Sequence, residues 1–167
     1  MSNNKSIIFM VMAIILAFYS HICFSFHDAT GRSISLSDFK NKWIIVNYWA
    51  DWCDSCIEEI PELNNFYKNN QDNNILIIGV NYDNLPNPVL QQAIRKTGIL
   101  FPVLQEDPAK VWRLGEITVL PTTYIINPDG DVVRKIIGPN TEQSLLKIIH
   151  NRLYGKKNIK EKKNPIA

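Results

Sequence analysis

The chain has 167 residues, the length of one ordinary domain, and 46% of them are hydrophobic, which is enough to build a core. The formal net charge of +2 is unevenly spread, because residues 26–154 hold 12 Lys or Arg against 15 Asp or Glu. Residues 155–167 hold five lysines against one glutamate. No basic stripe with interleaved aromatic residues runs through the acidic body, so nucleic-acid binding has little support.

The N-terminal segment is typical of an exported protein. Lys5 is the only charged residue before Asp28, and an apolar run follows it over residues 7–19. A positively charged start followed by such a run is typical of a secretory signal peptide. Counted through Phe26, the run also reaches the length that spans a bilayer. The sequence leaves both a cleaved signal and an uncleaved anchor open, and either one places the body outside the cytoplasm.

Three regions are therefore predicted. They are a signal peptide or N-terminal membrane anchor over residues 1–25, a folded domain over 26–154 and a basic, disordered tail over 155–167. The expected location is periplasmic or otherwise extracytoplasmic, with residues 7–26 as the anchor if the segment is retained.

Helix and strand patterns alternate along the body. Residues 26–32 are expected to be extended, with a turn at DATGR, and Ser35 with Asp38 has capping-box spacing. Apolar runs predict strands over residues 43–49, 74–82, 101–107, 118–127 and 131–138. Helical spacing and end signals predict helices over about 54–69, from near Pro88 to Gly98, over 108–115 with Gly115 closing it, and over 141–153 with Asn140 or Thr141 as its cap. This order predicts an α/β fold with a mixed central sheet flanked by helices.

A tight turn is expected between the last two strands, at the sequence NPDG. Its predicted mechanism is that Pro128 presets φ, Asp129 bonds back to the backbone and Gly130 accepts a positive φ.

Two cysteines, spaced CxxC, remain for the body once Cys23 is assigned to the export segment. Cys53 and Cys56 begin a predicted helix, where unpaired backbone N–H groups and the helix dipole favour thiolate over thiol. Structural zinc generally needs four ligands, and no second Cys or His pair is present, so no metal is expected. A structural staple is the other alternative, but so short a loop constrains the unfolded chain little.

The sequence VNYWADWCDSC, followed by Glu59, Ile60 and Pro61, resembles the exported TlpA/ResA-like branch of the thioredoxin superfamily, which typically reads VNFWATWCxPCxxExP. The resemblance extends over about residues 26–153 and includes a later Leu-Pro-Thr-Thr strand. The 44 residues between Ile77 and Pro121 resemble the strand-and-helix insertion of this branch. The resemblance implies a thioredoxin-like fold carrying that insertion.

The resemblance also implies roles for individual residues. Cys53 corresponds to the nucleophile and Cys56 to the resolving thiol, while Glu59 corresponds to an acid that relays protons near the pair. An ordinary first-turn helix carboxylate is the alternative for Glu59. Partner binding is implied for three further residues: Trp52 at the docking rim, Leu120, and Pro121 as the family's cis-proline.

One departure from the family pattern concerns redox poise. Asp54 and Ser55 occupy the dipeptide in which the family has proline before the second cysteine. Residues 51–62 contain five acids and no base. Negative charge beside Cys53 opposes its thiolate, and a less stable thiolate makes a dithiol a better reductant. We therefore expect a potential toward the reducing end, with steering of a basic partner as a second use of these acids.

The leading interpretation is an exported, monomeric thiol–disulfide oxidoreductase that needs no cofactor. By resemblance it reduces exported proteins with disulfides, including apocytochrome c during cytochrome c maturation, and receives electrons from a membrane-embedded thiol carrier. A disulfide oxidant or isomerase of the same fold is one alternative, and a copper-binding thioredoxin-like chaperone or a non-catalytic binding domain is another. A peroxidase is disfavoured because the Pro-x-x-x-Thr-x-x-Cys arrangement is absent.

Overall fold

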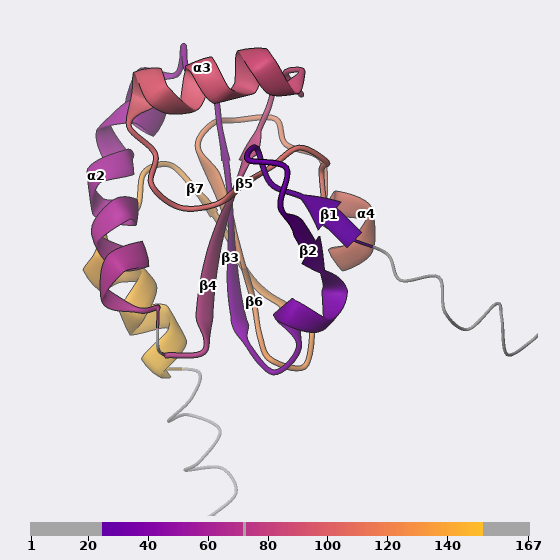
Figure 1. Cartoon of the computed structure of the whole chain (residues 1–167). Coiled ribbons are helices and arrows are strands. Elements are labelled where there is room, and N and C mark those ends of the chain that lie inside the picture. The colour runs from indigo at the N-terminus through magenta and orange to yellow at the C-terminus, as the bar shows by residue number, and fades with distance from the viewer. Residues whose placement is uncertain (1–24, 72, 152–167) are drawn as a thin grey trace, which may run out of the picture.

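A computed structural model describes residues 25–71 and 73–151 (Figure 1). Five strands form the central sheet in the order β5-β4-β3-β6-β7, and a separate two-stranded sheet joins β1 to β2. The elements are β1 Ser25–His27, β2 Ser33–Ser35, the 3-10 helix η1 Leu36–Phe39, β3 Trp43–Trp49, α2 Asp54–Asn69, β4 Ile75–Asn81, α3 Asn87–Thr97, β5 Val103–Leu104, α4 Ala109–Trp112, β6 Thr122–Ile126 and β7 Val132–Ile137. A last helix follows from residue 142 to the end of the described chain at 151.

Strand β3 is the centre of the sheet. It pairs in parallel with β4 and antiparallel with β6, and all seven of its residues are buried. Its side chains alternate between two apolar clusters, so that Ile45 and Trp49 belong to one cluster and Val46 and Tyr48 to the other. Such a run lacks polar alternation because both faces are covered, which confirms the prediction of a doubly buried strand.

The two clusters correspond to two layers that cover the sheet. Helices α2 and α3 and the last helix cover one face, whereas the β1–β2 hairpin, η1 and α4 cover the other (Figure 1). The expected mixed α/β sheet flanked by helices is therefore confirmed. Between β4 and β6 the chain adds α3, β5 and α4, and β5 becomes the edge strand parallel to β4.

Residues 25–35 form a hairpin, in which the expected extended piece and its turn at DATGR are followed by a second strand, β2, that the sequence did not predict. β1 pairs antiparallel with β2, with Phe26 opposite Ile34. The buried carboxylate of Asp28 holds the turn, since its Oδ1 accepts the N–H groups of Thr30 at 2.9 Å and Arg32 at 3.0 Å. The capping box between Ser35 and Asp38 forms as predicted.

Helix α4 ends earlier than predicted, and the turn before β7 uses a side chain that the prediction did not name. Helix α4 ends at Trp112 and not at Gly115, because Arg113 takes the left-handed conformation at φ 52° and Leu114 N–H returns to the carbonyl of Ala109 at 2.9 Å. In the turn before β7, the side chain of Asn127 makes the expected backbone bonds. Its Oδ1 accepts the N–H groups of residues 129 and 131 at 3.0 and 2.8 Å.

Close packing at Gly79 predicts a sensitive position in β4. A Cβ atom there would lie 3.1 Å from side-chain atoms of Trp49, Phe101 and Val103, all of which are buried. Gly79→Ala should lower the free energy of unfolding by about 1–3 kcal/mol, because these neighbours must move to admit the methyl group. Urea unfolding measures the change.

Gly115→Ala is the matched control, since its Cβ would meet only the Tyr124 hydroxyl at 3.6 Å. Equal unfolding free energies for the two variants would contradict the close packing assigned to Gly79.

Candidate active site

The two cysteines lie where β3 leaves the sheet and α2 begins. Cys53 is the N-cap of α2 and forms a disulfide with Cys56, with Cα atoms 5.2 Å apart. The backbone N–H of Cys56 points at the Sγ of Cys53 at 3.3 Å, and the Ser55 hydroxyl lies 3.6 Å from the same sulfur. In the reduced protein these groups and the helix dipole favour a thiolate at Cys53.

A shallow groove of about 540 Å³ surrounds Cys53. We call it the dithiol groove; its lining is Trp52, Cys53, Asp54, Ser55, Tyr82, Thr118, Val119 and Leu120. Trp52 is 60% exposed, and its indole N–H donates to Asp83 Oδ2 at 2.7 Å. The Leu120–Pro121 peptide bond is cis, as the resemblance implies, and Pro121 immediately precedes β6. The structure thus brings Trp52 and Leu120 to Cys53, although 68 residues separate these two in sequence.

Glu59 lies on the buried side of α2, one turn after Cys56, and is only 2% exposed. Its Oε1 accepts a hydrogen bond from Asn47 Nδ2 at 2.6 Å, and its Oε2 accepts one from the backbone N–H of Asn140 at 2.7 Å. Thr123 Oγ1 accepts from both amide side chains, at 3.1 Å from Asn47 and 3.2 Å from Asn140. Glu59 is therefore a buried, hydrogen-bonded carboxylate beyond the first turn of α2, whereas the alternative interpretation was an ordinary carboxylate in the first turn.

This environment changes the acidity of Glu59. Burial raises the pKa of its carboxyl group above the ordinary value, because the charged form loses solvation. The hydrogen bonds from Asn140 and Asn47 favour the charged form and offset only part of that effect. A buried carboxyl group with a raised pKa exchanges its proton at a higher pH than an ordinary carboxyl group does.

The acidic residues around Cys53 and Cys56 differ in their contacts and exposure. Lys96 of α3 reaches back to Asp51 and forms an ion pair with its Oδ2 at 2.9 Å, so the segment does face a base. Glu62 accepts the backbone N–H of Glu142 at 3.1 Å. Asp54 and Glu58 are the exposed acids nearest the cysteines in sequence. Residues 51–62 themselves contain no base, as the sequence shows, and α3 supplies one across space.

Several groups of this site were not identified from sequence. Asn140 was expected only as a possible cap for the last helix, yet its N–H holds Glu59, while Thr141 and Ser144 exchange the capping bonds. Thr123 and Lys96 also join the site from distant segments. Ordinary polar residues in a strand, turn or helix carry no local pattern that indicates such contacts.

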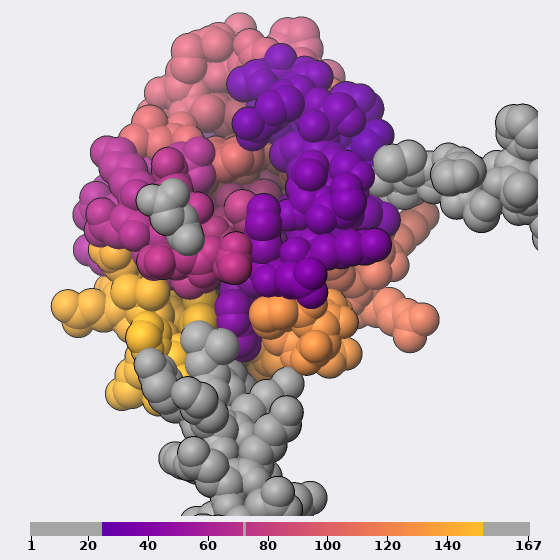
Figure 2. Space-filling model, turned by 60° about the horizontal axis from the view of Figure 1, so that its bottom comes forward, coloured from indigo at the N-terminus to yellow at the C-terminus, as the bar shows by residue number. Residues whose placement is uncertain are grey.

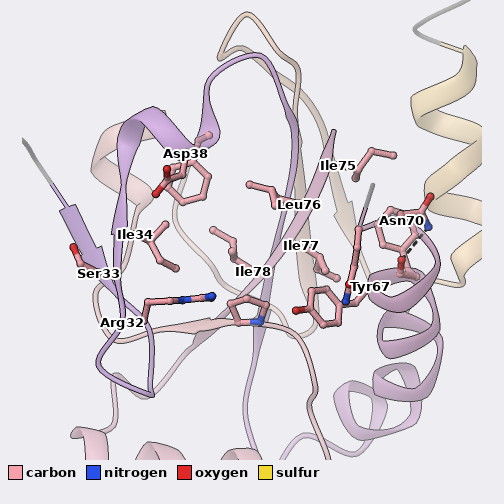
Figure 3. A pocket seen from close by; sticks show the side chains of 14 residues that line it. Arg32, Ser33, Ile34, Asp38, Tyr67, Asn70, Ile75, Leu76, Ile77 and Ile78 are labelled. Atoms are coloured by element: carbon pink, nitrogen blue, oxygen red, sulfur yellow. Dashed lines mark hydrogen bonds between the residues drawn. The ribbon is translucent and has the colours of Figure 1, made fainter. Parts of the chain in front are cut away.

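A separate hollow of about 360 Å³ lies at the other end of α2. In Figure 2 the hairpin and η1 stand on one side of it and the end of α2 on the other, and Figure 3 shows Arg32 and Tyr67 pointing toward one another across it. It runs along the first half of β4, where β5 provides no pairing because the register begins at Gly79. No cysteine lines this hollow, so it is distinct from the dithiol site.

Metal and membrane predictions can be compared only with the described part of the chain. Within residues 25–71 and 73–151, no group of three or more His, Cys, Asp or Glu side chains is arranged to hold a metal ion. Over the same residues, no helix is long and apolar enough to cross a bilayer. The predicted export segment, apart from Ser25, and the whole predicted basic tail over 155–167 lie outside the described residues.

Comparison with known proteins agrees with this geometry. The family model described as the AhpC/TSA family matches residues 20–135. The thiol–disulfide oxidoreductase ResA of Bacillus subtilis is 34% identical over 122 residues, which cover 73% of this chain and 68% of ResA. ResA of Bacillus cereus is 32% identical over 118 residues, covering 71% and 68% of the two chains.

Solved structures give the same result. StoA from Bacillus subtilis superposes with a TM-score of 0.61 at 25% identity, covering 73% of this chain and 92% of StoA. A thiol:disulfide interchange protein of the thioredoxin family from Chlorobium tepidum superposes with a TM-score of 0.65 at 28% identity, covering 77% and 91%.

The fold and the Cys53–Cys56 pair together define a thiol–disulfide oxidoreductase of the thioredoxin type. The chain belongs to the AhpC/TSA family and, within the thioredoxin superfamily, to the ResA-like thiol–disulfide oxidoreductases. The family resemblance and the enzyme class expected from the sequence are thereby confirmed.

The buried carboxyl predicts a pH-dependent effect on stability. Because the folded-state pKa of Glu59 is raised, its contribution to stability is complete below the unfolded-state pKa and is lost as pH rises through the folded-state pKa. The unfolding temperature of Glu59→Gln relative to that of the parent should therefore be higher near pH 8 than near pH 4, because the loss of one accepted hydrogen bond, from Asn47 or Asn140, is the same at both pH values. Thermal unfolding of both proteins across this pH range measures it.

Glu58→Gln is the matched control, since Glu58 is exposed on the same helix. A difference in unfolding temperature between Glu59→Gln and the parent that is equal at pH 4 and pH 8 would show that the buried charge is not its source.

Proposed function

We propose that this protein reduces disulfide bonds of exported proteins, with Cys53 as the attacking thiol and Cys56 as the resolving thiol. The observation that carries the proposal is the asymmetry of the pair. Cys53 caps α2 and lines the dithiol groove. Cys56 is fully buried, and Glu59 on the same helix is buried as well. A partner disulfide can therefore reach Cys53 first.

The proposed reaction proceeds in two balanced steps. The Cys53 thiolate attacks one sulfur of the partner disulfide, which forms a mixed disulfide and releases the other partner sulfur as a thiol after protonation. Cys56 then gives its proton to the Glu59 carboxylate and attacks the Cys53 sulfur, which breaks the mixed disulfide, and the second partner sulfur leaves as a thiolate that takes this proton from Glu59. Two electrons pass to the partner, and the protein is left with the Cys53–Cys56 disulfide.

The surface around Cys53 supplies the proposed partner-binding residues. Trp52 and Leu120 line the dithiol groove, and Pro121 sets the chain direction between this groove and β6. A partner segment lying in the groove would place its disulfide over Cys53, while Trp52 provides an exposed aromatic face fixed by its bond to Asp83.

The proposed location outside the cytoplasm is supported by Lys5 and the apolar run over residues 7–19. An exported compartment oxidises thiols, so turnover needs electrons from a membrane-embedded thiol carrier. Resemblance to the TlpA/ResA-like branch makes apocytochrome c before haem attachment a candidate substrate. The body acts in the same way whether the N-terminal segment is cleaved or retained as an anchor.

A disulfide oxidant of the same fold is the second candidate, and a specific observation favours it. The Cys56 N–H and the Ser55 hydroxyl both stabilise a Cys53 thiolate, and a more stable thiolate makes the disulfide a stronger oxidant. Asp54, Glu58 and buried Glu59 act in the opposite sense. The reduction potential decides between the two candidates.

Trapping partners tests the proposed function. In Cys56→Ala the mixed disulfide on Cys53 has no resolving thiol, so covalent complexes should accumulate in cells and disappear on treatment with dithiothreitol. Mass spectrometry of these complexes should identify proteins with export signals. Cys53→Ser is the matched control and should form none, and cytoplasmic partners alone would contradict the proposed location.

The potential tests the proposed direction of electron flow. Known dithiol proteins range from roughly −270 to −120 mV, and equilibration with dithiothreitol or glutathione should place this pair toward the reducing end. Asp54→Asn should raise the potential by roughly 5–20 mV, since an exposed charge contributes about 0.2–1 kcal/mol. Asp131→Asn, in the turn before β7, is the matched control. A parent potential near −120 mV, the oxidant end of that range, would instead support the second candidate.

A further inference from the structure

A larger groove lies beside the dithiol groove, at the ends of β3, β4 and β5. Its volume is about 950 Å³, and the residues that matter here are Tyr48, Asn81, Tyr82, Asp107, Glu116 and Ile117. We call it the acidic groove. Because Tyr82 lines both grooves, and Ile117 and Thr118 line one each, the two form a continuous depression. Ligands commonly bind beyond the carboxyl ends of parallel strands, the position that β3, β4 and β5 provide here.

An unpartnered donor lines the acidic groove. Asn81 is the last residue of β4 and is 6% exposed. Its Oδ1 accepts the backbone N–H of Asp83 at 3.1 Å, but its Nδ2 has no hydrogen-bond partner among the described residues. A buried amide donor without an acceptor is destabilising. This nitrogen is closed to solvent, so a ligand carbonyl in the groove would satisfy it once the Asn81 side chain turns toward the ligand.

The charges of the acidic groove are unbalanced. Three carboxylates line it, on Glu106, Asp107 and Glu116, against a single base, Lys110. Glu106 is already paired with His27. Its Oε2 accepts the backbone N–H of His27 at 2.7 Å, and its Oε1 lies 3.0 Å from His27 Nδ1.

The other two carboxylates keep acceptor capacity. Asp107 accepts from Tyr48 and from the backbone of Ala109, but both bonds end on Oδ1. Its Oδ2 and the Glu116 side chain have no partner among residues 25–71 and 73–151. The acidic groove therefore offers two exposed carboxylates with free acceptor oxygens for a cation, beside a buried amide donor without a partner.

Two carboxylates beside an amide donor fit a ligand that carries both a cation and a carbonyl group. We propose that the acidic groove binds an extended segment of the partner protein, next to its reacting cysteine, that carries a lysine or arginine. The cation contacts Asp107 and Glu116, the side-chain stem lies against Tyr82 and Ile117, and a main-chain carbonyl accepts from Asn81 Nδ2. This inference rests on the proposed function and assigns its substrate class.

Synthetic peptide disulfides test the inference with the full-length protein. One lysine is placed in turn at two to six residues on either side of the reacting cysteine, and norleucine replaces it in the reference peptide. At one register the lysine peptide should be reduced with a kcat/KM about two- to fivefold higher, since Asp107 and Glu116 are exposed and an exposed ion pair contributes only modestly. A lysine-to-norleucine ratio near one at every register would overturn the inference.

Variants locate the effect in the acidic groove. Glu116→Gln and Asp107→Asn should each bring the lysine-to-norleucine ratio toward one, whereas Asp131→Asn should preserve it. Asp131 is a suitable control because the turn before β7 lies at the opposite end of the sheet, where Ile44 pairs with Ile126. A ratio that falls equally in all three variants would show a general charge effect and contradict the assigned groove.

Two further measurements separate this inference from the proposed function. Reduction of a small disulfide, 5,5′-dithiobis(2-nitrobenzoate), reports exchange at Cys53 without a peptide. If the protein does not reduce this compound, the proposed function itself is rejected. In the Cys53→Ser, Cys56→Ser protein, adding the lysine peptide should shift the Asn81 side-chain amide resonances in a ¹⁵N-correlated spectrum. Unshifted Asn81 resonances at saturating peptide would overturn the carbonyl contact.

Discussion

The pairing of β3 between β4 and β6 is the constraint on which the active site depends. All seven residues of β3 are buried, and its register places Tyr48 opposite Thr122, the first residue of β6. The chain can leave this buried strand only beyond Trp49, where it reaches Cys53 and begins α2. The same register brings Leu120 and Pro121, just before β6, to the end of the strand. The dithiol and its facing loop are therefore positioned by one set of backbone hydrogen bonds.

A polar network inside the apolar core lies close behind the dithiol. Glu59 accepts hydrogen bonds from β3 through Asn47 and from the loop before the last helix through Asn140. Burying the charged carboxylate of Glu59 destabilises the folded state, and this is why the pKa of Glu59 is raised. The same cost makes Glu59 a suitable proton acceptor for Cys56, so the energetic penalty and the proposed catalytic use have one origin. Buried ionisable groups with a shifted pKa are more typical of working sites than of structural cores.

Electrostatics at the site depends on contacts between segments. Thiolate at Cys53 is favoured by the Cys56 N–H, the Ser55 hydroxyl and the helix dipole, and is opposed by nearby acids. Lys96 neutralises one of these acids from α3. The acidic groove, next to the dithiol groove, is likewise built from several segments, which supply its carboxylates and the unpaired amide of Asn81. Redox poise and partner choice are thus governed by side chains that the Cys-x-x-Cys motif does not include.

The sequence by itself determined the strands, the helices, the cysteine pair and the family, because apolar runs, capping residues and a dense motif are local signals. It also indicated Glu59 and Pro121, although through resemblance and not through geometry. Only the tertiary structure decided that Glu59 is buried and that Lys96 and Asn140 reach the site. Burial and contact depend on which segments pack together, and that is a property of strand register and layer packing. The hairpin at the N-terminus and the acidic groove arise in the same way, from neighbours that are far apart along the chain.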